Sequence, residues 1–176
     1  SLDCAFKDKP TSDYVVLQVW ARARANRYLI WQFRGRLDMI GTVSLIERTK
    51  KRFPQIDSFY VEEAANGAAV LSTLRGKIEG LIAVTPKGGM ESRAHAGTPF
   101  VEAGNGWIPE NGAGGWEGPE REGDPVKAFI HEHKVFPRGK NDDQVDALTQ
   151  LLERWRQSEI KIVPLPAARE PRGVVM

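Results

Sequence analysis

Apolar residues in the first part of the chain follow the pattern of β-strands. Two runs rich in β-branched and aromatic residues, YVVLQVW and RYLIWQF, lie on either side of the polar segment ARARAN. This arrangement predicts two antiparallel strands joined by a turn near Asn26. The short opening run from Ser1 to Phe6 predicts a third strand beside them.

After this hairpin, helical and strand-like patterns alternate along the chain. The segment LDMIGTVSLIERTKKRFP has apolar residues at helical spacing, and Pro54 ends the predicted helix. A strand at 58–61, a helix ending near Gly76 and a buried strand in GLIAVTP are predicted next. Residues 87–103 are compatible with a helix, and PVKAFIHEHKVFP and DDQVDALTQLLERWR predict the last two helices.

One long segment between these helices has no regular pattern. Residues 105–124 are rich in glycine and have few apolar anchors. We expect this span to form a flexible loop or hairpin beside the cleft, where it would control the entry of a ligand.

The order of elements predicts an α/β fold. Three consecutive strands followed by alternating helices and strands are typical of a mixed β-sheet with an antiparallel edge and helices on both faces. Residues 1–158 are expected to form one domain of this kind, and residues 159–176 a flexible tail. Folds of this class bind ligands at the ends of their strands.

Composition narrows the class of protein only a little. The 176 residues include 25 Lys and Arg against 23 Asp and Glu, so the net charge neither requires nor excludes a nucleic-acid partner. A single cysteine, Cys4, excludes an internal disulfide and a cysteine zinc site, and this fits a reducing compartment. No apolar run reaches the roughly 18 residues of a membrane-spanning helix, so we expect a soluble protein with no membrane partner.

Carboxylates occur at three places that a sheet of this kind could bring together. They are Asp3 in the first strand, Glu62 and Glu63 after the apolar run FYV, and Asp142, Asp143 and Asp146 at the start of the last helix. Burying a carboxylate in an apolar strand is costly unless it is paired or bound to a cation. If the three places converge, Mg²⁺ or Mn²⁺ is the natural counter-ion, because these hard cations prefer oxygen ligands. Two such ions about 3.5 to 4 Å apart can hydrolyse a phosphodiester bond.

Each acid also has a purely structural explanation. Asp142 could cap the last helix, and the helix dipole favours Asp143 at that position. Glu62 could belong to a solvated pair at a strand end, and Asp3 could pair with a nearby Lys or Arg. Asp146 is harder to explain in this way, because it lies one turn from two other acids and crowds like charges on one side of the helix.

Basic residues near these acids are candidates for contacts with DNA phosphates. The candidates are Lys87, Arg93, Lys140, Arg22 and Arg24, with Arg27 and Arg138 as further cations of the same segments. Arg22 and Arg24 alternate along the predicted hairpin and would share one face of it, where a solvated strand edge explains them equally well. Lys140 is a stronger candidate, because it directly precedes the acidic segment.

In these motifs the chain resembles the C-terminal nuclease domain of the large terminase subunit of tailed bacteriophages, a member of the ribonuclease H-like superfamily. The match runs in order from Ser1 to about Arg156. SLDCAFKDKPTSDYVVLQVW resembles the first strand with its catalytic acid, and FYVEEAANGAAV the second acidic motif. TPKGGMESRA resembles a basic helix start, and FPRGKNDDQVDALTQ resembles the closing acidic motif.

The resemblance implies a ribonuclease H-like fold and a Mg²⁺- or Mn²⁺-dependent endonuclease that uses two metal ions to cut concatemeric viral DNA. The catalytic residues carried over are Asp3, Glu62 and Asp143, which also bind metal together with Asp146 and Asp142. Two positions depart from the family pattern: Asn141 stands where relatives often have His, and Met90 where they often have Lys.

The resemblance also implies partners and a cellular setting. The substrate would be double-stranded DNA, and the full-length protein would have an N-terminal ATPase domain and would act with the portal ring and the small terminase subunit. The location would be the cytoplasm of the infected bacterial host. The chain has no GxxxxGK(S/T) phosphate-binding loop, so that ATPase part is not within these 176 residues.

Two other functions are compatible with the same sequence. A Holliday-junction resolvase, or another ribonuclease H-like nuclease, would share the fold and the acids but would prefer branched DNA. A non-catalytic module that docks on DNA or on the portal ring would instead have a degenerate acidic set, and the presence of all three acidic motifs argues against it.

Overall fold

The computed structural model describes residues 1–4, 14–63, 67–110, 115–117 and 123–159. The strands are β1 (Leu2–Cys4), β2 (Val15–Ala23), β3 (Asn26–Gly35), β4 (Phe59–Glu62), β5 (Leu81–Val84) and β6 (Gly106–Trp107). The helices are α1 (Met39–Arg52), α2 (Gly67–Leu74), α3 (Met90–Glu102), α4 (Pro125–Val135) and α5 (Asp143–Glu159). The tail predicted at 159–176 lies outside the described residues except for Glu159, which ends α5.

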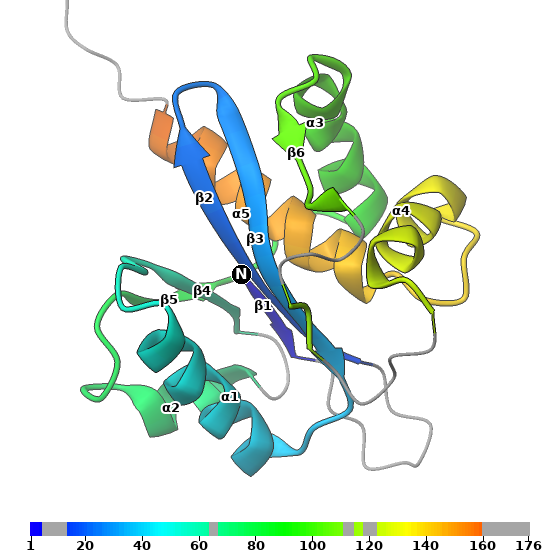
Figure 1. Ribbon diagram of the computed structural model, residues 1–176. Helices are drawn as coiled ribbons and strands as arrows, with labels where there is room; N and C mark the ends of the chain where they lie inside the picture. Colours follow the sequence, from blue (N-terminus) through cyan, green and yellow to red (C-terminus); the bar gives the residue numbers. More distant parts are fainter. Residues whose placement is uncertain (5–13, 64–66, 111–114, 118–122, 160–176) are drawn as a thin grey trace, which may run out of the picture.

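The strands form one six-stranded mixed sheet, as predicted from the order of elements (Figure 1). The strand order is β5-β4-β1-β2-β3-β6. The pairs β1–β2 and β2–β3 are antiparallel, whereas β1–β4, β4–β5 and β3–β6 are parallel. The sheet therefore combines an antiparallel hairpin with a parallel half, and the predicted α/β fold is confirmed.

The hairpin turn lies at residues 24–25, directly before Asn26. Arg24 adopts a positive φ of 55°, a left-handed conformation that suits a tight turn. Arg24 is therefore in the turn and not on the strand, and the expectation that it would alternate with Arg22 along one strand face is wrong. Both residues are exposed.

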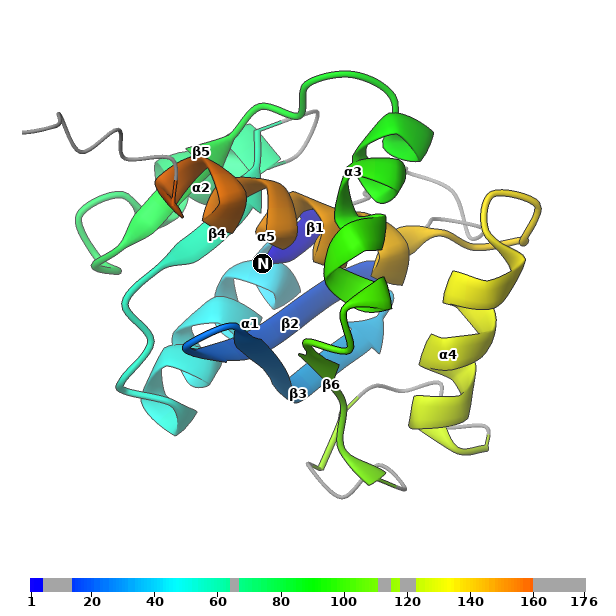
Figure 2. The same cartoon turned by 90° about the horizontal axis from the view of Figure 1, so that it is seen from above.

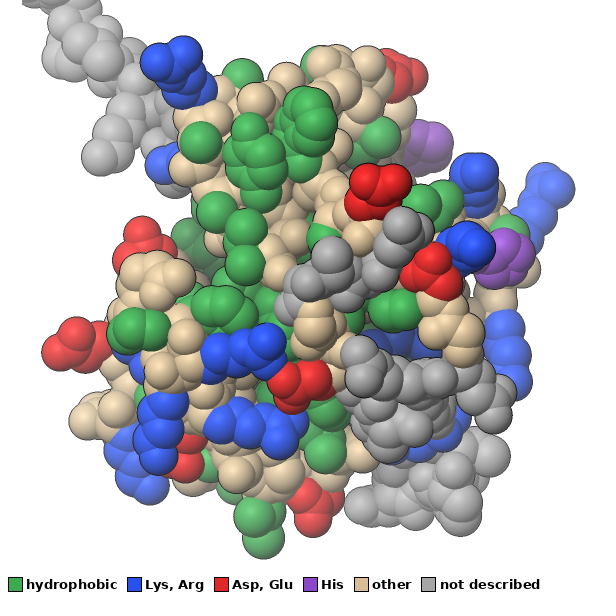
Figure 3. All heavy atoms as spheres, in the orientation of Figure 1, with side chains coloured by type: hydrophobic (Ala, Val, Ile, Leu, Met, Phe, Trp, Pro, Cys, Tyr) green, Lys and Arg blue, Asp and Glu red, His purple; other side chains and the backbone are tan. Residues whose placement is uncertain are grey.

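One face of the sheet packs an apolar layer against α1 and α2. Leu2, Leu17, Trp31 and Val61 point into this layer, together with residues of the two helices that include Leu45, Ile46, Val70 and Leu74. Asp38 caps the start of α1, and its carboxylate accepts a hydrogen bond from the backbone N–H of Gly41. α1 ends in Lys50, Lys51 and Arg52, and Figure 3 shows Lys and Arg side chains gathered on this face of the molecule.

The opposite face of the sheet is covered by α5, which lies across β1 and β2 with α3 beside it (Figure 2). A second apolar cluster packs α4 and α5 against β3 of the hairpin. Its buried members are Leu29, Trp116, Val126, Phe129 and Leu148. Between the two clusters, β2 and β3 each place a glutamine against α5. Gln18 and Gln32 are almost fully buried there, so this face is built around hydrogen bonds.

Two expectations about the remaining segments need correction. The strand predicted as buried in GLIAVTP is β5, at the edge of the described sheet, and Ala83 within it is exposed. The glycine-rich span does not form only a loop, because β6 pairs with β3 and Trp116 is 2% exposed. Residues 111–114 and 118–122 of that span lie outside the described part of the chain.

None of the helices described is both long enough and apolar enough to cross a membrane.

Candidate metal centre

Asp3 and Glu62 are placed side by side by the pairing of two parallel strands. Leu2 of β1 is opposite Val61 of β4, and both are buried in the apolar layer under α1 and α2. Side chains alternate between the faces of a sheet, so the next residue of each strand, Asp3 and Glu62, points to the face covered by α5. The alternation that buries the apolar core thus also presents the two carboxylates.

A glycine makes this arrangement compatible with the helix that follows β4. A side chain at Gly67, the first residue of α2, would place its Cβ 1.6 Å from the carbonyl oxygen of Glu62. Only glycine allows the helix to begin so close to the end of the strand. The position of Glu62 therefore depends on Gly67.

The first two turns of α5 bring the third acidic motif over these strands. Asp143 and Asp146 are buried, and Asp142, just before the helix, is exposed. One carboxylate oxygen each from Asp3, Glu62 and Asp146 lie within 4.8 Å of one another, which is close enough for a shared metal ion. Asp143 is not in this close group.

Asp143 lies further across the sheet, on the side of β3. Asp3 is opposite Val16, which is in turn opposite Arg34 on β3. The Asp143 carboxylate lies 3.9 Å from the Arg34 guanidinium. The two buried acids of α5 are thus divided, with Asp146 over β1 and β4 and Asp143 towards β3.

Burial and the neighbouring acids raise the proton affinity of Asp3 and Glu62. Burial, followed by the charges of Asp146, Glu62, Asp143 and Asp142, raises the pKa of Asp3 well above its usual value. Burial and then the charge of Asp146 also raise the pKa of Glu62. Asp3 and Glu62 therefore bind a proton more readily than free carboxylates do, so the centre favours a positively charged ligand.

The pKa of Asp143 is raised to about 6 for a partly different reason. Burial is the largest cause, and the nearby carboxylate of Glu132 on α4 is the second. Arg34 acts in the opposite direction and favours the ionised form. Asp143 is therefore electrostatically linked both to the close group and to α4.

One cation, Arg93, lies directly against the close acidic group. Its guanidinium forms an ion pair with Asp146 and donates a hydrogen bond to the carbonyl of Gly88, 3.1 Å away. The side chain is 8% exposed. Its charge also opposes the rise in the pKa of Glu62. Arg93, predicted as a DNA contact, thus lies at the acidic centre itself.

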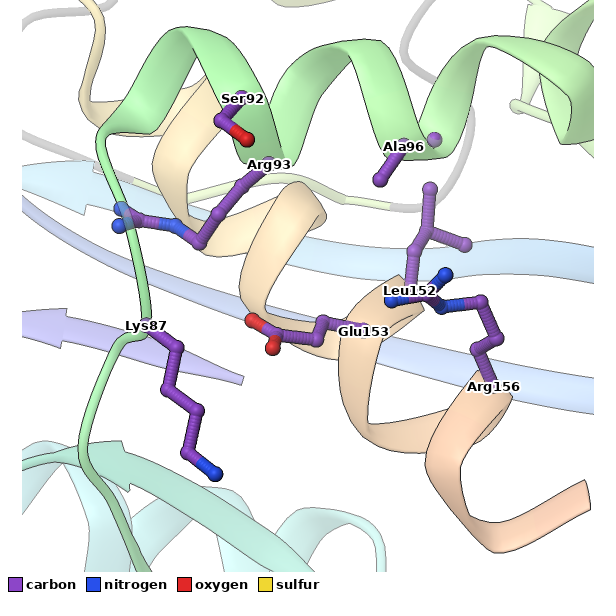
Figure 4. A pocket seen from close by; sticks show the side chains of 8 residues that line it. Lys87, Ser92, Arg93, Ala96, Leu152, Glu153 and Arg156 are labelled. Carbon is purple, nitrogen blue, oxygen red and sulfur yellow. The ribbon is translucent and has the colours of Figure 1, made fainter. Parts of the chain in front are cut away.

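A small basic pocket extends from Arg93 along α5 (Figure 4). It has a volume of about 90 Å³, and its lining includes Lys87, Ser92, Arg93, Glu153 and Arg156. Figure 4 shows the carboxylate of Glu153 between the cations of α3 and its preceding segment on one side and Arg156 on the other. Lys87 is exposed and lies on the same side of the molecule as the centre.

The other predicted DNA contacts lie at different distances from the centre. Lys140 is exposed in the segment just before α5. Arg22 is six residues beyond Val16 on β2, which corresponds to about 20 Å along the strand. Its guanidinium carbon lies 5.9 Å from the centre of the Trp155 ring. The structure therefore does not bring the hairpin arginines to the acidic group.

Glu132 is a buried acid near the centre that the sequence interpretation missed. Its side chain is 7% exposed and lies 3.4 Å from the Arg34 guanidinium. The signal was present in the sequence, because Glu132 follows the buried residues Val126 and Phe129 at helical spacing and so lies on the apolar side of α4.

The family of the chain follows from its sequence as a whole. Residues 1–154 match the family described as terminase RNaseH-like domain. The chain belongs to this family. Among curated protein sequences, none matches the chain.

Solved structures of a terminase nuclease domain share this family's fold with the chain. The human cytomegalovirus terminase nuclease domain has a TM-score of 0.64 and 10% sequence identity, with 86% of this chain and 80% of that chain covered. The manganese-soaked form of that domain gives 0.61 and 10%, and the manganese-soaked, inhibitor-bound form gives 0.60 and 12%; each covers 86% of this chain and 79% of that one. At this identity, the likeness shows a common ribonuclease H-like fold.

Proposed function

We propose that this domain is a Mg²⁺- or Mn²⁺-dependent endonuclease that cuts double-stranded DNA as the nuclease part of a tailed-bacteriophage terminase. The observation that carries the proposal is the convergence of Asp3, Glu62 and Asp146, whose carboxylate oxygens lie within 4.8 Å. Membership of the terminase family supports the choice of viral DNA as the substrate.

The residues present fit a hard divalent cation. All the candidate ligands are carboxylate oxygens, the donors that Mg²⁺ and Mn²⁺ prefer. Asp3, Glu62 and Asp146 would hold one ion, and Asp143 and Asp142, whose charges act on Asp3, would supply oxygens for a second. When bound, such ions supply an activated water and stabilise charge on the leaving oxygen.

The residues around the acids have the charges that a nucleic-acid substrate requires. Four or five carboxylates repel phosphate, so cations must offset their field before DNA can approach. Arg93 lies against Asp146, and Lys87 and Lys140 are exposed on the segments that lead into α3 and α5. These three residues are proposed to contact the DNA backbone, with Arg22 and Arg24 reaching a more distant part of the duplex.

The wider setting is part of the same proposal. The domain would work with an N-terminal ATPase domain of the full-length protein, together with the portal ring and the small terminase subunit. It would act in the cytoplasm of the infected bacterial host. The cut would fall in concatemeric DNA.

Plasmid cleavage tests the proposal. The chain should nick or linearise supercoiled DNA with Mg²⁺ or Mn²⁺ and be inactive in EDTA, and Asp3→Asn should abolish cutting. Glu63→Gln is the matched control, because Glu63 is exposed and accepts a hydrogen bond from Thr85, outside the close group. Cutting without a divalent ion, or by Asp3→Asn at the wild-type rate, would refute the proposal. Preferential cutting of a four-way junction over plain duplex would indicate a resolvase instead.

A further inference from the structure

A chain of buried side-chain hydrogen bonds connects the sheet to the first turn of α5. The Trp20 indole Nε1–H donates to Gln18 Oε1 at 3.0 Å, and Gln18 Nε2 donates to Gln32 Oε1 at 3.0 Å. Gln32 Nε2 then donates to Gln144 Oε1 at 2.7 Å, and Gln144 Nε2 donates to Glu132 Oε2 at 2.6 Å. The three glutamines are at most 2% exposed, so these bonds form away from water.

The two ends of this chain determine the orientation of every amide in it. An indole N–H can only donate and an ionised carboxylate can only accept, whereas each glutamine amide can do either at each end. With Trp20 at one end and Glu132 at the other, every Nε2 points towards the carboxylate. A buried network of this kind is stable only when all of its members are satisfied.

Glu132 also holds the backbone of α5. Its second oxygen, Oε1, accepts the backbone N–H of Gln144 at 2.7 Å, one of the N–H groups that the first turn of a helix leaves without an internal partner. In addition, Gln18 Nε2 donates to the carbonyl of Gln144 at 3.1 Å. Gln144 is thereby held at its N–H, its carbonyl and its side chain, and it lies between Asp143 and Asp146 in the sequence.

We propose that Glu132 is a positioning residue of the acidic centre. By ending the amide chain and capping α5 from α4, it sets the depth and rotation of the first turn, and so places Asp143 and Asp146 relative to Asp3 and Glu62. This inference rests on the proposed function in that the positioned acids are taken to bind metal. Glu132 does not need to touch the metal or the DNA for this role.

The isosteric change Glu132→Gln isolates the role. The new amide can accept from the Gln144 N–H through its oxygen, but its Nε2 then faces the Nε2 of Gln144, donor against donor. One amide must turn over, and this places donor against donor, or acceptor against acceptor, at the next hydrogen bond in the series that leads to Trp20. Outer partners that orient ligands typically contribute about 10-fold to 100-fold to metal affinity, so Mn²⁺ should bind more weakly by about that factor.

A charge swap provides the rescue. In Glu132→Gln/Gln144→Glu, the new residue 132 donates to the carboxylate at 144, which also accepts from Gln32 Nε2, so every donor within the series of amides again meets an acceptor, and only the ion pair of Arg34 with residue 132 is lost. This double variant should recover affinity to within a few-fold of wild type, with the same net charge. Glu79→Gln removes an exposed carboxylate far from the chain of amides and should leave Mn²⁺ binding unchanged.

Calorimetric titration with Mn²⁺ measures these affinities, and melting in EDTA measures the fold separately. Wild-type affinity in Glu132→Gln, or a folded swap variant that still binds weakly, would overturn the positioning role. If Glu132→Gln does not fold, the swap variant alone decides between these results.

A second readout separates this inference from the proposed function. Amide hydrogen exchange in EDTA should be faster at residues 143–147 of Glu132→Gln than of wild type, and unchanged in β2 and β3. If the wild-type chain binds no Mn²⁺, the proposed function fails, while the exchange result still decides whether Glu132 holds α5. Unchanged exchange at 143–147 would overturn the positioning role.

Discussion

The acidic centre should destabilise the protein when no metal is bound, and the change Asp3→Asn should reveal this. Carboxylate oxygens no more than 4.8 Å apart repel by at least about 3.5 kcal/mol per ionised pair at an effective dielectric constant of about 20. Asp3 faces two such partners, Glu62 and Asp146. Arg93 offsets part of the repulsion through its ion pair with Asp146.

Protonation sets how much of this repulsion remains at a given pH. The folded-state pKa of Asp3 is raised above its unfolded value, so the folded protein binds more protons between the two values. Stability is therefore lost as pH rises from near 4 through the folded pKa. At low pH, Asp3 is neutral and asparagine relieves little. At high pH, the substitution should restore about 1 to 3 kcal/mol, a fraction of the pairwise repulsion.

Thermal melting at pH 5.5 and 8.5 tests this expectation. A gain of that size raises the melting temperature of a domain of this length by roughly 2 to 10 °C. In EDTA the gain should be larger at pH 8.5 than at pH 5.5. With Mn²⁺ the order should reverse, because only the wild type has the full ligand set and is stabilised by binding.

Asp57→Asn is the matched control, because Asp57 is exposed and lies outside the acidic group. Its melting temperature should follow the wild type at both pH values. The reasoning is refuted if Asp3→Asn melts below the wild type in EDTA at pH 8.5, since Asp3 would then stabilise the fold rather than strain it.

Three further predictions concern Asp143 and two glycines, Gly67 and Gly97. Asp143, with its pKa raised to about 6, should make the wild type lose stability between pH 4 and 6, so the melting temperature of Asp143→Asn relative to wild type in EDTA should rise over that range; a flat difference would contradict the burial of this carboxylate. Gly67→Ala should destabilise by about 1 to 3 kcal/mol and weaken Mn²⁺ binding, because its Cβ would displace the Glu62 backbone. Gly97→Ala, which meets only the end of the Leu152 side chain at 3.2 Å, should be neutral or stabilising in denaturant melts.

Much of the fold could be predicted because local pattern and tertiary environment agree. The hairpin, α1, α4 and α5 have the periodicity of their final elements, and the carboxylates Asp3 and Glu62 follow strand patterns that bury their neighbours Leu2 and Val61. The parallel pairing of β1 and β4, which the sequence analysis did not specify, brings those two acids together.

Features that depend on sheet edges and long-range pairing could not be predicted in the same way. An apolar run such as LIAV is typical of a buried strand, yet β5 is at the edge of the described sheet and Ala83 is exposed. Both features depend on which elements pack around the strand, which the run itself does not specify. β6 has two residues, Gly106 and Trp107, and no periodicity of its own. It exists because β3 offers a free edge at Arg27 and Tyr28.

The sequence does not specify whether Asp143 or Asp146 lies nearer to Asp3. The two acids are three residues apart, which is about 60° around an α-helix of 3.6 residues per turn, so a small rotation of α5 exchanges the acid that lies nearer to Asp3. The sequence motif includes both acids, but it does not determine how α5 is rotated about its own axis. That rotation is held by Gln144, bound to Glu132 and Gln32 on one side of the helix. On the other side, Gln150 Nε2 donates to the carbonyl of Tyr60 on β4 at 3.2 Å. Which of the two acids lies nearer to Asp3 therefore depends on the hydrogen bonds that Gln144 makes with Glu132 and Gln32, so a substitution at Glu132 should change the position of Asp146.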